Sequence, residues 1–146
     1  MTRLTSLLAA GLVLTPLAAI AGEKLHVVEH VSANEKTTHV TASKADDAVA
    51  DQLTFANPVF DAANKTQIGS DVGHCVRIEV GKSWDCYWTL ILKSGMIVIA
   101  GPFYDKGDST FMITGGTGKY AGAKGQMTLH DRGTTPTTYD FVYELL

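Results

Sequence analysis

The feature that most constrains the fold is a series of short apolar segments separated at regular intervals by glycine-rich turns. Short alternating segments bounded by Gly, Ser and Asn are typical of β-strands, and their regular spacing favours a β-sandwich or a closed antiparallel barrel. The expected strands are residues 25–31, 37–41, 53–60, 74–80, 84–92, 96–100, 109–114, 126–131 and 137–145. Pro58 limits its strand to an edge or a break. Only residues 42–51, which are Ala-rich and acidic, have helical character.

The N-terminus carries a pattern of its own. Residues 1–21 contain one positive charge, an apolar run over 7–20, and small residues at Ala19 and Ala21. This order is typical of a secretory signal, and we expect cleavage after Ala21. Residues 22–146 then form a single mature domain that is exported, to the periplasm or the outside of the cell, and meets an oxidising environment.

Composition and motifs exclude several functions. The chain has 12 Lys and Arg against 15 Asp and Glu, with no basic run, so nucleic-acid binding is not expected. Residues 116–121 fit a loose dinucleotide pattern, but the glycines after them predict a strand where that site needs a helix. The five histidines lack the spacing of metal ligands, and no GxSxG motif is present. We therefore expect neither a metal nor a nucleotide.

Two cysteines lie on either side of the hairpin predicted at residues 81–83. On adjacent antiparallel strands, Cys75 and Cys86 fall roughly opposite each other. Either they form a disulfide, which export favours, or they are two separate buried thiols. A register slip of one residue would turn one of them to the other face, so the sequence leaves both alternatives open.

Three local patterns between Asn57 and Leu129 resemble the plant allene oxide cyclases. They are G-H-C-V-R-I at 73–78, G-P-F at 101–103 followed by Asp108 and I-T-G-G-T-G at 113–118, and G-x-x-G-Q-x-x-L at 122–129. The G-G-T-G-K-Y segment is also shared with the dirigent proteins. The resemblance implies an all-β fold, an eight-stranded antiparallel β-barrel that is often trimeric. Its lumen would bind a hydrophobic, reactive small molecule without a cofactor.

The resemblance also implies a site. In the cyclases a Glu on the first strand, an Asn and a Cys line the place of ring closure, and these match Glu29, Asn57 and Cys75. The chain departs from the family at Val31 and Phe103, where the cyclases have Asn and Tyr, and it lacks their Ser-Pro pair. The resemblance therefore fits a relative that acts on an apolar substrate other than a plant fatty acid.

Further lumen residues are expected to contact the ligand. These are Arg77, Trp88, Phe103 and Tyr143. Two functions fit such a lumen. One is a cofactor-free isomerase or cyclase, which needs an ionisable group inside; the other is a dirigent-like or lipocalin-like protein that binds an apolar ligand without catalysis.

Glu29 separates these functions. Alternation places it on one strand face with Leu25, Val27 and Val31. An acid on an apolar face is buried for a purpose, paired with a cation such as Arg77, or turned outward to water. All three interpretations remain open, as does a simple turn role for Asn57 before its proline.

Alternation also links the site to assembly. Cys75 and Arg77 share one strand face, and Val76, Ile78 and Val80 share the other. If Cys75 faces the lumen, the Val/Ile face lies outside and another subunit must cover it. If Val and Ile fill the lumen, a monomer suffices.

Overall fold

The computed structural model describes residues 22–39, 47–135 and 137–146. Over these residues the chain forms strands and one 3₁₀ turn. They are β1 (Glu23–His30), β2 (Lys36–Thr38), β3 (Gln52–Asp61), β4 (Gln67–Glu79), β5 (Ser83–Leu92), β6 (Gly95–Tyr104), β7 (Ser109–Gly116), η1 (Gly118–Tyr120), β8 (Gly125–Asp131) and β9 (Thr138–Leu145).

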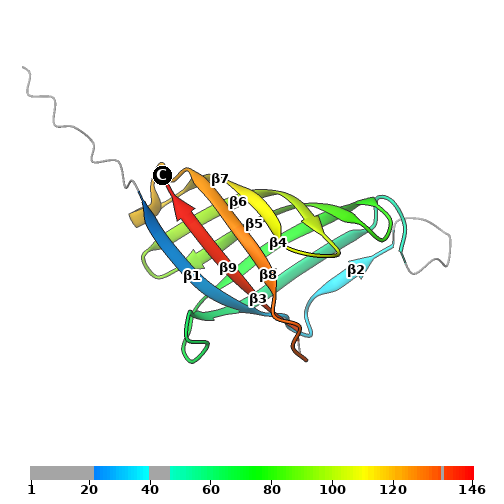
Figure 1. The fold of residues 1–146 in the computed structure, drawn as a ribbon, viewed down its shortest axis with the longest axis horizontal. Coiled ribbons are helices and arrows are strands. Elements are labelled where there is room, and N and C mark those ends of the chain that lie inside the picture. Colours follow the sequence, from blue (N-terminus) through cyan, green and yellow to red (C-terminus); the bar gives the residue numbers. More distant parts are fainter. Residues whose placement is uncertain (1–21, 40–46, 136) are drawn as a thin grey trace, which may run out of the picture.

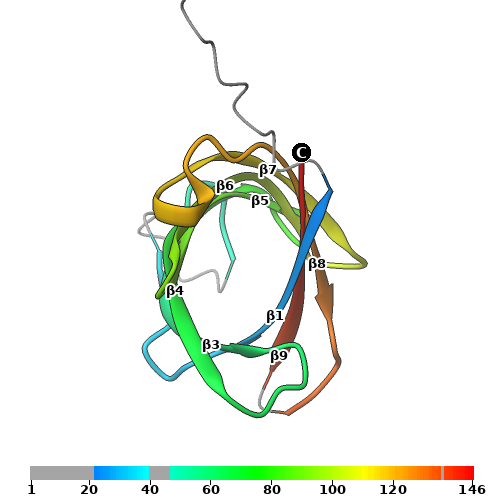
Figure 2. The same ribbon diagram turned by 90° about the vertical axis from the view of Figure 1, so that its left-hand side faces the viewer.

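The strands form a closed antiparallel barrel (Figure 1). Neighbours follow the order β1-β9-β8-β7-β6-β5-β4-β3-β2, and a further pairing of β1 with β3 closes an eight-stranded ring (Figure 2). The short strand β2 lies outside this ring, beside the start of β3. The predicted fold class is confirmed, and of the two architectures left open by strand spacing, the barrel is the one that forms.

The ring closes unevenly around Pro58. β1 pairs only with the last three residues of β3, from Val59 to Asp61, and β2 pairs with the first three, from Gln52 to Thr54. The proline lies between these pairings, where a missing N–H costs nothing to the sheet. The break predicted at this residue is therefore a local gap in pairing on one side of a long strand.

Strand boundaries differ from the prediction mainly in β4, which begins at Gln67 rather than at residue 74. Glycines at 69 and 73 hide the alternation of its first half. Gly73 is needed there, because a Cβ atom at this position would lie 2.2 Å from the Cβ of Trp88 on the neighbouring strand. The absence of a side chain lets the indole pack across the barrel interior.

Two other differences concern short segments. Residues 47–51 form no helix, and the rest of the predicted helical turn lies outside the described residues. A 3₁₀ turn forms at Gly118–Tyr120, where only turns were expected. It begins on Gly118 with φ of +59°, a left-handed conformation that glycine adopts without strain. The predicted signal segment, residues 1–21, also lies outside the described residues. Among the described residues, no helix is long and apolar enough to cross a membrane.

Inward-facing residues of all eight barrel strands fill the lumen. The buried core includes Val27, Val59, Cys75, Trp84, Cys86, Trp88, Leu90, Ile97, Ile99, Phe111, Ile113, Met127, Leu129, Phe141, Tyr143 and Leu145. Trp88 lies at its centre, with ring centroids 4.5 Å from Phe111 and 5.6 Å from Phe141. The core is therefore aromatic at mid-barrel.

The outer face of β4 is apolar and uncovered in the single chain. Val72 and Ile78 of β4, and Val80 just after it, are 40%, 55% and 48% exposed, while Cys75 on the opposite face is buried. Of the two orientations that alternation allowed, the structure has the one with Cys75 toward the lumen and the valines outside.

Candidate functional site

Glu29 of β1 points into the barrel and is 4% exposed. Asn57 of β3 donates a hydrogen bond from Nδ2 to its Oε1 at 2.6 Å. Burial is the largest influence on this carboxyl group and raises its pKa to about 7; the Asn57 hydrogen bond opposes the rise and the nearby charge of Glu35 adds to it. The interpretations of Glu29 as solvent-facing or paired with Arg77 are therefore wrong, and the buried one holds.

Asn57 is held so that its amide faces the acids. Its Oδ1 accepts a hydrogen bond from the backbone N–H of Ser32 at 3.0 Å, and Ser32 also donates from Oγ to the carbonyl of Ala56 at 3.2 Å. The amide nitrogen reaches Glu29 and, at 3.4 Å, Oε2 of Glu35. Because the oxygen is fixed by Ser32, the donor end of the amide is directed at the carboxyl groups. Asn57 is therefore a buried positioning group, not a turn residue.

Asp71 is a second fully buried acid of the lumen, and it was not among the residues predicted from the sequence. It lies on β4 directly opposite Asn57 in the β3–β4 register. Its carboxyl group interacts with the carboxyl group of Glu29 and with the backbone of Asn57. Burial, followed by the nearby charge of Glu29, raises its pKa well above the ordinary value. Extending alternation upstream from Cys75 would have placed Asp71 on the lumen face.

A cavity of about 110 Å³ opens beside Glu29. Its walls combine acids, aromatic rings and the two cysteines: Glu29, Glu35, Leu53, Phe55, Cys75, Cys86, Trp88, Phe103, Leu129, Tyr139 and Phe141. Of the predicted ligand contacts, Trp88 and Phe103 line this cavity. The Phe103 ring packs edge-on against Tyr139, with centroids 6.2 Å apart. Burial raises the pKa of Tyr139 to about 12, so its hydroxyl stays protonated at neutral pH.

Tyr143, predicted to contact the ligand, is completely buried and is not among the residues that line the cavity. Burial raises the pKa of Tyr143 well above the ordinary value, and the charges of Asp71 and Glu29 add to this. Tyr143 therefore belongs to the polar interior behind the cavity wall.

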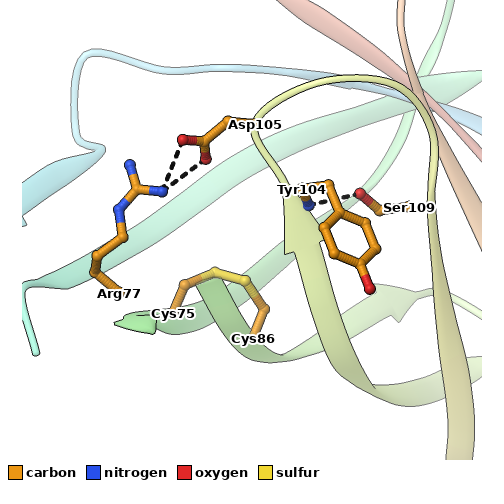
Figure 3. The surroundings of a disulfide bond; sticks show 6 residues. All are labelled: Cys75, Arg77, Cys86, Tyr104, Asp105 and Ser109. Atoms are coloured by element: carbon orange, nitrogen blue, oxygen red, sulfur yellow. Dashed lines mark hydrogen bonds and ion pairs between the residues drawn. A yellow bond between two sulfur atoms is a disulfide. The ribbon is translucent and has the colours of Figure 1, made fainter. Parts of the chain in front are cut away.

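Arg77 does not line the cavity, contrary to the role predicted for it. Its Nε donates to Asp47 Oδ1 at 2.7 Å. Its Nη1 donates to both carboxyl oxygens of Asp105 at 2.7 and 2.8 Å (Figure 3). The guanidinium also lies 4.0 Å over the Trp84 ring. Because its donors are directed at these acids, Arg77 links the segment before β3 to the β6–β7 turn. These donors contact protein carboxylates instead of a ligand.

Cys75 lines the cavity, but as one half of a disulfide with Cys86 (Figure 3). The two residues are direct partners in the β4–β5 register. The disulfide is thus the alternative that forms, and the position offers no thiol to a ligand. A catalytic thiol role for Cys75 is not available in this oxidised form.

The described residues hold no group of three or more His, Cys, Asp or Glu side chains arranged to bind a metal ion. The three acids near Asn57 do not converge on one point in that way. Their chemistry is proton transfer and charge, in a cavity with largely aromatic walls.

Comparison with known proteins identifies the family. Residues 23–143 match the sequence family described as allene oxide cyclase, which covers nearly the whole barrel. The chain belongs to the allene oxide cyclase family. The resemblance seen in three local patterns is thereby confirmed and extends from β1 to β9.

Solved structures similar to this allene oxide cyclase family member share its barrel. One is a pyocyanin demethylase, 23% identical, with a TM-score of 0.71 over 85% of this chain and 100% of that one. The pterocarpan synthase dirigent protein PsPTS1 is 14% identical, with a TM-score of 0.69 over 88% and 96% of the two chains. The Diels–Alderase AbmU from Streptomyces koyangensis is 15% identical, with a TM-score of 0.61 over 88% and 72%. At these identities the likeness shows the fold.

Proposed function

We propose that this protein is a cofactor-free acid–base catalyst of the isomerase or cyclase type, acting on a hydrophobic small molecule bound in the lumen. The observation that carries the proposal is the carboxyl group of Glu29, buried at a cavity wall and with a pKa of about 7. A group that titrates near the working pH can both accept and return a proton. Similarity to proteins named as a Diels–Alderase and as dirigent proteins supports a role in guiding a small molecule's reaction.

The chemistry follows from the geometry. Ionised Glu29 takes a proton from one atom of the ligand and, once protonated, returns it at another, so that the ligand is isomerised with no net gain or loss. Asn57 donates to the carboxylate and holds it in place. Asp71, whose raised pKa favours its protonated form, supplies a neutral neighbour that does not repel the charge on Glu29. The aromatic walls exclude water and orient the ligand.

The alternative is a binding protein without catalysis. The observation that favours it is the disulfide in the cavity wall, which leaves no thiol where the related cyclases have a Cys. In that case the buried acids would only select the ligand.

One experiment distinguishes the two functions. Native mass spectrometry of protein purified from its source would identify the bound compound, which is then incubated with wild type and with Glu29→Gln in D₂O. A catalyst converts the compound or incorporates deuterium into it, and the variant, when saturated with the compound, does so about 10²-fold more slowly. A compound returned unchanged by wild type contradicts catalysis. A Glu29→Gln variant as active as wild type removes Glu29 from the site.

We also propose that the mature chain is exported and assembles as a homotrimer. The disulfide supports export to an oxidising compartment. The exposed Val72 and Ile78 on β4, with Val80 just after it, support assembly, because an apolar strip of this kind is normally covered. Native mass spectrometry and N-terminal sequencing test both statements; a monomer, or a product that retains residues 7–20, contradicts them.

A further inference from the structure

Among the described residues, the charged side chains of the cavity wall are all acidic. Glu29 and Glu35 contribute carboxyl groups, and none of the described residues that line the cavity is Lys, Arg or His. The basic residue on the lumen face of β4, Arg77, is already engaged by two carboxylates. The cavity therefore has negative charge without a protein counter-charge.

A second observation concerns a third buried acid. Asp71 is fully buried opposite Asn57 and interacts with the Glu29 carboxyl group, and none of the described groups that shift its pKa is a cation. A buried acid without a cation beside it is costly unless something compensates its charge or it is kept protonated. Glu35, Glu29 and Asp71 thus influence one another in the interior, and the amide of Asn57 donates to the first two.

The remaining walls are aromatic. Phe55, Trp88, Phe103, Tyr139 and Phe141 surround the same space. Ring faces attract cations, and aromatic walls combined with carboxylates are the arrangement that binds quaternary or aromatic nitrogen cations. When Glu29 and Glu35 are ionised, a neutral ligand would leave their charge uncompensated, and an anionic ligand would be repelled by it.

We propose that the lumen takes a flat organic cation, an aromatic molecule that carries a positively charged nitrogen. This inference rests on the proposed lumen-binding function and adds the charge class of the ligand. The rings bind the flat body of the molecule, and Glu29 and Glu35 lie at the wall to balance its charge.

The test uses three probes of nearly equal shape and different charge. They are N-methylquinolinium, which is positive; 1-methylnaphthalene, which is neutral; and 1-naphthoate, which is negative. Binding to the full mature protein is measured at pH 8 by calorimetry and by quenching of tryptophan fluorescence, because Trp88 lies in the cavity wall. We expect the cation to bind at least about tenfold tighter than the neutral probe, and the anion to bind weakest.

A pair of variants then separates local from overall charge. Glu35→Gln removes one negative charge from the cavity wall, and Asp85→Asn removes one from an exposed position on β5. We expect the first to weaken cation binding several-fold and leave the neutral probe unchanged, and the second to change neither.

The outcomes are distinct for the two proposals. Equal or tighter binding of the neutral probe overturns the charge preference and leaves the lumen as a binding site for apolar molecules. An equal loss of cation affinity in the two variants also overturns it, because overall charge would then explain the result. Failure of all three probes to bind overturns the preference together with the ligand-binding lumen.

Discussion

The barrel contains two buried charged regions, which differ in whether their acids have a cation as a partner. At one end of β4, Arg77 donates to Asp47 and Asp105 at 2.7 Å and stacks over Trp84. Gly69 lies eight residues before Arg77 on the same strand. Between these two residues lies Asp71, which faces Asn57 and Glu29 without any cation. In the first region the acids are paired with a cation, and in the second they are not.

The difference indicates what each region does. A charge with hydrogen-bonded partners, such as Arg77, joins chain segments and tolerates burial because its partners replace water. An unbalanced acid pair lowers stability whenever it ionises, so its retention points to chemistry or ligand binding rather than to the fold. The same strand thus carries a structural ion pair at Arg77 and, six residues away at Asp71, a buried acid without a cationic partner.

The largest expected difference between the two regions is in how they make the free energy of unfolding depend on pH. The pKa of Glu29 is raised from 4.5 to about 7 on folding, so the folded state binds more protons than the unfolded state between these values. Its contribution to stability is complete below pH 4.5 and is lost as the pH rises through 7, which amounts to about 3 kcal/mol. The raised pKa of Asp71 acts in the same direction. Urea unfolding at pH 5 and pH 8 measures the loss.

Glu29→Gln is the control for this effect. Gln keeps an acceptor for the Asn57 amide and cannot ionise. We expect the variant to be more stable than wild type at pH 8 and to show a smaller difference between the two pH values. A variant less stable than wild type at pH 8 would mean that the ionised carboxylate is paired after all.

The sequence predicted those parts of the fold and the site that follow from the alternation of side chains along a strand. It placed Glu29 with Leu25 and Val27 on one face, and that face is the lumen. It also showed that Cys75 and the apolar Val76 lie on opposite faces of β4. The eight-stranded barrel followed from turn spacing together with the family patterns, and the structure confirms it.

Other parts of the site depend on contacts between distant strands. Asp71 was missed because Gly69 and Gly73 interrupt the apolar pattern, although both only make room for β5 side chains and backbone. Arg77 was expected in the lumen because it shares a face with Cys75. Its partners, Asp47 and Asp105, lie about thirty residues away on either side in sequence, so no local pattern could reveal them.

The next effect concerns the disulfide between the two regions. Cys75 lies between Asp71 and Arg77 along β4, and its bond to Cys86 encloses a short loop. Reduction is expected to lower the free energy of unfolding by about 2 to 3 kcal/mol, the amount typical of a short loop. The pH slope caused by Glu29 should be the same with and without reductant. A slope that changes on reduction would show that the two regions are coupled.

Arg77→Met tests the region in which the acids are paired with a cation. Methionine keeps the apolar stem over Trp84 and leaves Asp47 and Asp105 without a cation. We expect a loss of about 2 kcal/mol, below the cost for a fully buried pair because both acids are partly exposed. Urea unfolding of the variant at pH 6 and pH 8 should show the same loss at both values. No loss at all would mean that the ion pair adds nothing to the fold.

Glu35→Gln gives the smallest expected effect and shows whether the acids act together. Glu35 is half-buried at the cavity wall, and its charge is among the causes that raise the pKa of both Glu29 and Asp71. Removing that charge should therefore lower the pKa of Glu29 from its value of about 7, in the direction opposite to burial. Stability should change by less than about 0.5 kcal/mol, because Glu35 is only half-buried and its amide contact with Asn57 is long. Carboxyl-carbon NMR titration of Glu29 in the two proteins measures the change. A Glu29 pKa that does not move would show that Glu29 titrates independently of Glu35, and burial alone would then account for its raised value.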